Sequence, residues 1–132
     1  MILLDTHCAI WFTTDSGLGK RSQAIADEAL AADQLAISVI SFWEISMLVA
    51  KRRLRSVDSA SKLREVVLNS GINEIPLTGD IAILAGNLES LHGDPADRFI
   101  VATAIAHEAT LMTADARLLE WRHKLRRQNA EK

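Results

Sequence analysis

The stretch Glu89-Ser-Leu-His-Gly-Asp-Pro-Ala-Asp-Arg-Phe-Ile-Val-Ala-Thr-Ala104 predicts a buried helix that opens with two acids. Asp94 followed by Pro95 is typical of a helix N-cap and the first helical position, because proline lacks an N–H that would be unpaired there. Asp97 then falls at the third helical position. The next two turns carry almost only apolar or small residues, so this helix is expected to be buried. Its acids are either caps or parts of a site.

Short apolar runs alternate with helical patterns on both sides of this stretch. The runs span residues 2–4, 35–39, 72–75 and 110–113. Strands alternating with helices predict βαβ units, hence an α/β fold whose mostly parallel sheet carries helices on both faces. Residues 1–132 fit a single domain without a linker. The basic stretch from about 122 to 132 is expected to be a loosely held tail.

Composition excludes several classes of protein. With 15 Lys+Arg against 17 Asp+Glu the net charge is -2, so any contact with nucleic acid must be local. The single cysteine, Cys8, cannot form an internal disulfide and is expected to lie in the core with Trp43. There is no apolar run of about 18 residues, and the opening strand is too short for a signal peptide. We expect a soluble protein of the cytoplasm with no membrane contact.

Acids stand directly after two of the predicted strands. Asp5 follows the first and Asp115 the last, and ligands of open α/β sheets bind at the carboxyl ends of the strands. Each of these acids, like Asp97, could instead stabilise only a helix start. Glu44 resists that interpretation because it lies within an apolar helical segment, where a carboxylate without a partner costs several kcal/mol. Glu44 therefore needs a cation.

A divalent ion shared by these acids would supply that cation. Mg²⁺ prefers carboxylate oxygens and keeps several waters, which leaves positions for phosphate oxygens. Without metal, clustered carboxylates repel one another and raise one another's pKa values. One or two such ions can activate a water and neutralise the leaving oxygen of a phosphodiester. The predicted chemistry is therefore metal-assisted cleavage of phosphodiester bonds.

Four segments in order resemble the motifs of PIN-domain ribonucleases of the VapC toxin type. They are Leu3-Leu4-Asp5-Thr6-His7, Ser38-Val-Ile-Ser-Phe-Trp-Glu-Ile45, His92-Gly-Asp-Pro-Ala-Asp-Arg98 and Leu111-Met-Thr-Ala-Asp115. Each motif is weak alone, but four at these spacings over nearly the whole chain are specific. Two positions depart from the pattern. Ala96 replaces a frequent phenylalanine and Leu48 a frequent lysine, and neither change removes an acid.

The resemblance implies a PIN-like three-layer α/β/α sandwich and an endoribonuclease toxin that depends on Mg²⁺ or Mn²⁺. It implies a homodimer, an RNA substrate and a cognate VapB-type antitoxin in a prokaryotic cell. The residues that it assigns to metal binding and catalysis are Asp5, Glu44, Asp97 and Asp115, supported by Thr6 and Thr113. Candidate RNA contacts are Lys51, Arg52 and Arg53, a basic cluster at one helix end, and Arg98 of the third segment.

Two other classes remain open from the sequence. A receiver-like signalling module would use Asp5 to accept phosphate, but it leaves Glu44 unexplained and needs a lysine where Asp115 stands. A catalytically idle PIN-like interaction domain would not need all four acids. His92 is expected to be a solvated loop histidine.

Overall fold

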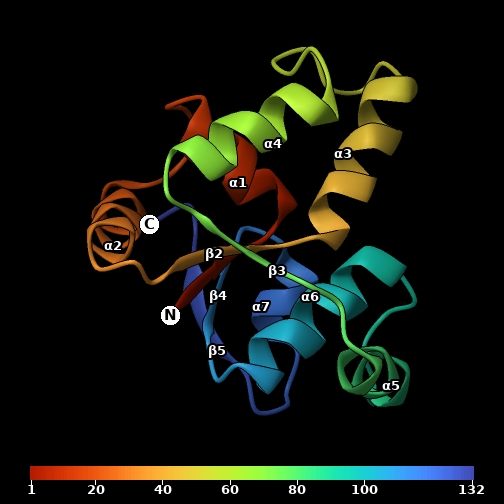
Figure 1. Ribbon diagram of the computed structural model, residues 1–132. Coiled ribbons are helices and arrows are strands. Elements are labelled where there is room, and N and C mark those ends of the chain that lie inside the picture. The colour runs from red at the N-terminus through yellow and green to blue at the C-terminus, as the bar shows by residue number, and fades with distance from the viewer.

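A computed structural model describes residues 1–132 as a five-stranded sheet between two layers of helices (Figure 1). In chain order the elements are β1 (Ile2–Leu4), α1 (Thr6–Thr13), α2 (Lys20–Ala31), β2 (Leu35–Ser38), α3 (Ile40–Ala50), α4 (Ala60–Asn69), β3 (Asn73–Ile75), α5 (Gly79–Asn87), α6 (Pro95–Ala106), β4 (Thr110–Thr113), α7 (Ala116–Glu120) and β5 (Arg126–Asn129). The strand order is β3-β2-β1-β4-β5, and every neighbouring pair is parallel. The predicted α/β class is confirmed.

Alternate residues of each strand enter two separate cores. Leu3 and Leu111 belong to the core under α5, α6 and α7, whereas Leu4 and Met112 belong to the core under α1, α2 and α4. All four side chains are fully buried. This follows from the period of two along a strand, which sends successive side chains to opposite faces. A sheet buried on both faces explains why its strands read as continuous apolar runs.

The carboxyl ends of β1 and β4 lie side by side because these strands pair, with Leu4 opposite Met112. The chain runs outward from β1 through β2 to β3, and then returns to the other side of β1 with β4. The order therefore reverses between β1 and β4. Such a switch point opens a crevice beyond the strand ends, where ligands of α/β sheets bind.

The C-terminal residues differ from the predicted loose tail. Residues 126–129 form β5 and pair in parallel with β4, and Ala130 beyond them is fully buried. The guanidinium of Arg127 donates to the carbonyls of Leu118, Trp121 and His123. The expectation of a loose tail is therefore wrong for residues 126–129. Their charged side chains form no apolar run from which an edge strand could be predicted.

Helix α3 also differs from expectation. Trp43 was expected in the core, yet it is 49% exposed, and Met47 one turn later is 38% exposed. Only Ser41 and Ile45 of this helix are fully buried. The apolar α3 therefore has an uncovered face, while other parts of it pack against α4 and α6. No helix of the structure is long and apolar enough to cross a membrane.

Candidate metal centre

The four predicted acids line one cavity of about 370 Å³ at the switch point. Asp5 follows β1, Glu44 belongs to α3, Asp97 lies in the first turn of α6 and Asp115 precedes α7. Side chains from four separate segments thus meet beyond the strand ends. The cavity also contains Thr6, His7, Trp11, Asp94, Ala114 and Arg117.

Asp5 is held rigidly at the base of the cavity. Its Oδ1 accepts the Cys8 backbone N–H at 2.9 Å, and this bond makes Asp5 the N-cap of α1. Its Oδ2 accepts the hydroxyl of Thr113, which is fully buried. The Thr113 Oγ1 in turn accepts the Asp115 N–H at 3.1 Å. The cap and the site interpretations of Asp5 are therefore compatible, and Thr113 links two of the acids.

Thr6 supports the opposite wall of the cavity. Its hydroxyl donates to Ser41 Oγ at 3.0 Å, which ties the start of α1 to the start of α3. Ser41 is fully buried, and α3 begins at Ile40 without a side-chain cap. This contact fixes the helix that carries Glu44, whose side chain is half-buried and faces the cavity.

Asp97 is the acid most strongly affected by its surroundings. Burial raises its pKa to about 7, and the charges of Asp94, Asp115 and Glu44 add to the rise while Arg117 opposes it. Asp94 is the N-cap of α6 and accepts the Asp97 N–H at 3.4 Å, as its position before proline predicts. The raised pKa indicates that negative charge in this cavity is incompletely neutralised.

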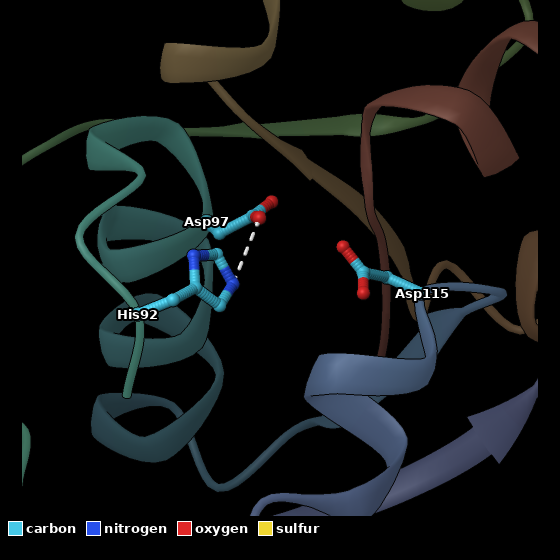
Figure 2. A group of neighbouring side chains, drawn as sticks. All are labelled: His92, Asp97 and Asp115. Atoms are coloured by element: carbon cyan, nitrogen blue, oxygen red, sulfur yellow. Dashed lines mark ion pairs between the residues drawn. The ribbon is translucent and has the colours of Figure 1, made fainter. Parts of the chain in front are cut away.

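His92 lies beside Asp97 rather than in solvent. Its Nε2 is buried and lies 3.2 Å from Asp97 Oδ2, without the alignment of a hydrogen bond. Figure 2 shows its ring beside Asp97, with Asp115 across a gap. The Asp94 N–H donates to His92 Nδ1 at 3.3 Å, so a neutral ring carries its proton on Nε2. His92 therefore presents an N–H to the Asp97 carboxylate.

Arg117 supplies a cation to the cavity. Its Nη2 lies 2.9 Å from Asp115 Oδ2 and 3.5 Å from Asp97 Oδ2, and its Nε donates to Asp115 Oδ1 at 3.2 Å. These hydrogen bonds lower the pKa of the Asp115 carboxyl. The sequence analysis missed this residue. The helix dipole disfavours a cation at the second position of a helix, and this unusual placement was the sequence signal for a role of Arg117.

The donor set fits a hard divalent cation. Four carboxylates face one cavity, and atoms of His92, Asp97 and Asp115 lie within 4.8 Å of one another. Carboxylate oxygens suit Mg²⁺ or Mn²⁺, and the cavity has five carboxylates against the single guanidinium of Arg117. Asp5, Glu44, Asp97 and Asp115 could hold such an ion.

The basic residues singled out in the sequence lie elsewhere. Lys51, Arg52 and Arg53 follow the far end of α3 and do not line the cavity. Arg98 donates to five backbone carbonyls, those of Ala85, Gly86, Leu88, Leu91 and His92. A guanidinium has five N–H donors, so Arg98 is committed to holding the segment between α5 and α6. Its predicted contact with RNA is corrected accordingly.

Cys8 plays no part in the chemistry. It belongs to α1 and is fully buried. Burial and the neighbouring Asp5 raise its pKa, so the reactive thiolate does not form. The expectation that Cys8 belongs to the core is confirmed.

Comparison with known proteins agrees with this arrangement. The sequence matches the PIN domain family over residues 2–124. It is 36% identical over 125 residues to Ribonuclease VapC22 of Mycobacterium tuberculosis, covering 92% of both chains. The structure resembles that of VapBC2 from Rickettsia felis bound to a promoter DNA fragment, with a TM-score of 0.68 and 22% identity over 98% of both chains. A toxin–antitoxin complex from Klebsiella pneumoniae matches at 28% identity over 87% of both chains, with a TM-score of 0.57. The chain therefore belongs to the PIN-domain family, among its VapC-type members.

Proposed function

We propose that this protein is a metal-dependent endoribonuclease and the toxin of a toxin–antitoxin pair. The observation that carries the proposal is the meeting of Asp5, Glu44, Asp97 and Asp115 around one cavity at the switch point of the sheet. The relative named Ribonuclease VapC22 supports RNA as the substrate. The Klebsiella pneumoniae toxin–antitoxin complex supports the toxin assignment.

The chain's own residues prepare this cavity for a phosphodiester. The bonds from Thr113 and the Cys8 N–H fix the Asp5 carboxylate, and the Thr6–Ser41 bond fixes the helix of Glu44. The Asp94 cap fixes the first turn of α6, which carries Asp97. A rigid carboxylate shell of this kind favours catalysis because it needs no reorganisation during the reaction.

We propose Mg²⁺ or Mn²⁺ as the cofactor, held by the same four acids. When bound, such an ion supplies an activated water and neutralises charge on the leaving oxygen. To hold the ion, Asp97 would be ionised and Asp115 would lose its pairing with Arg117, since carboxylates bind metal in the deprotonated form.

We propose a VapB-type antitoxin as the partner that restrains the enzyme, and a homodimer as the assembled toxin in a prokaryotic cytoplasm. The net negative cavity suits a Lys or Arg from the antitoxin, because a cation there replaces part of the metal's charge. The exposed side chains of Trp43 and Met47 on α3 supply apolar surface for a second chain. Light scattering of the pure protein tests the dimer directly.

The two alternative functions receive less support. A receiver-like module has the strand order 2-1-3-4-5, whereas this sheet has the order β3-β2-β1-β4-β5. An idle interaction domain has no need for a cavity lined by five acids, namely Asp5, Glu44, Asp94, Asp97 and Asp115.

The test is incubation of the purified protein with a pool of total RNA in Mg²⁺, in Mn²⁺ or in EDTA, followed by mapping of the cut ends. We expect defined cuts that EDTA abolishes and that Glu44→Gln removes while the protein stays folded. Glu28→Gln is the matched control, because Glu28 is exposed on α2 and does not line the cavity. Cutting by Glu44→Gln at the wild-type rate would show that Glu44 has no role.

A further inference from the structure

A second hollow, of about 470 Å³, adjoins the acid cavity. Arg117 lines both, and His92, which lies 3.2 Å from Asp97, lines the second. The two hollows therefore share a wall formed by Arg117 and the contact between His92 and Asp97. Anything that extends from the acid cavity past Arg117 enters the second hollow.

The second hollow is less acidic than the first. Arg117, Arg122, His92 and His123 line it, and Glu120 is its one acid. The acid cavity has five carboxylates and a single guanidinium. Arg117 is paired with Asp97 and Asp115, so Arg122 is the cation of this hollow that is available to an RNA phosphate.

Aromatic rings lie within the same hollow. His123 packs on Trp121 with ring centroids 4.7 Å apart and 34° between the planes. Trp121 is buried, and its Nε1 donates to the Glu89 carbonyl at 2.9 Å, which fixes the indole. His123 is exposed, so part of its ring contacts Trp121 and the rest is accessible to a ligand. A supported ring with a free face is a platform on which a base can stack.

This segment is ordered before any ligand arrives. The guanidinium of Arg127 on β5 donates hydrogen bonds to the carbonyls of Leu118, Trp121 and His123. These bonds tie the segment between α7 and β5 to the edge of the sheet. The backbone that carries Arg122 and His123 is thus held in place, and binding there costs little ordering entropy.

We propose that the second hollow is an RNA subsite for a nucleotide next to the cleaved bond. Arg122 binds the phosphate of that nucleotide, and His123, backed by Trp121, stacks on its base. The proposal rests on the proposed ribonuclease function. The basic C-terminal segment then has a function: β5 supports the subsite through Arg127.

The test uses the shortest RNA that the wild-type protein cleaves and the same RNA lengthened one nucleotide at a time at either end. We expect one addition to lower KM by about tenfold, in line with stacking of one base. Arg122→Gln and His123→Ala should remove most of that gain, so that lengthening the RNA lowers KM little in either variant. His123→Phe keeps a stacking face and should retain the gain.

Arg21→Gln is the matched control, because Arg21 is an exposed cation of α2 outside both hollows. An equal gain from lengthening in wild type, Arg122→Gln and His123→Ala would overturn the subsite. The subsite would also be overturned if Arg122→Gln and His123→Ala raised KM equally for the short and the long RNA, or if Arg21→Gln did so. Loss of the gain in His123→Phe would overturn stacking. A wild-type protein that cleaves no RNA would instead overturn the proposed function.

Discussion

Arg117 binds both carboxylate oxygens of Asp115, because its Nε lies 3.2 Å from Oδ1 and its Nη2 lies 2.9 Å from Oδ2. The same Nη2 reaches Asp97 at 3.5 Å. Arg117 is 58% exposed at its side chain, so these pairs are weak in solution and a divalent ion can displace them. Arg117 and the metal therefore compete for the same two acids.

Removal of that competitor should strengthen metal binding. Arg117→Gln is expected to lower the Kd for Mn²⁺ about two- to fivefold, because an exposed pair contributes up to ~1 kcal/mol. Titration calorimetry in the absence of RNA measures this. Arg21→Gln removes an equal charge away from the cavity and should leave the Kd unchanged. An unchanged or weaker affinity in Arg117→Gln would refute the competition.

The stability of the metal-free protein should fall as the pH rises from about 4 to 7. The folded pKa of Asp97 is about 7 against an ordinary value of 3.8. The folded state therefore binds more protons than the unfolded state in that window, and the free energy of unfolding decreases with pH. Thermal melts in EDTA across this range measure the effect.

Asp97→Asn is the control for that measurement, because it cannot ionise. The difference in melting temperature between wild type and variant should shrink toward low pH and become constant above about pH 8. Saturating Mn²⁺ should raise the wild-type melting temperature most at high pH, where the carboxylate is free to bind. A difference in melting temperature between wild type and Asp97→Asn that does not change with pH would refute the raised pKa of Asp97.

Thr113 should matter to both stability and activity. Thr113→Val keeps the shape but removes the hydroxyl that serves Asp5 and the Asp115 N–H, at a cost of about 1 to 3 kcal/mol. Loss of such a supporting bond typically weakens metal affinity or activity 10- to 100-fold. Thr113→Ser keeps the hydroxyl and should recover most of both. Equal stability and equal activity of Thr113→Val and Thr113→Ser would mean that only packing matters at this position.

Much of the fold was predictable because local patterns determine it. The apolar runs before Asp5 and Asp115 became β1 and β4, and Asp94 caps α6 as its position before Pro95 predicts. The meeting of Asp5 and Asp115 also followed, since parallel strands bring their carboxyl ends to one edge. Glu44 and Asp97 lie in helices, and only the family resemblance assigned them to the same site.

The rest depended on tertiary contacts that leave no periodic pattern. Strand β5 has charged side chains and pairs only because β4 offers a free edge. Trp43 lies in an apolar run but on the uncovered face of α3. Arg98 was predicted to contact RNA and Arg117 was not singled out, and only the folded chain shows that Arg98 binds carbonyls and Arg117 binds carboxylates.

The most direct test of the metal centre compares RNA cleavage by Asp94→Asn and Asp97→Asn under matched Mn²⁺. Asn caps a helix about as well as Asp, so Asp94→Asn should change stability by a few tenths of a kcal/mol and keep most activity. Asp97→Asn weakens a metal ligand without changing the helix, and the rate should fall about a hundredfold or more. Loss of cleavage in Asp94→Asn with retention in Asp97→Asn would contradict the assignment of cap and ligand.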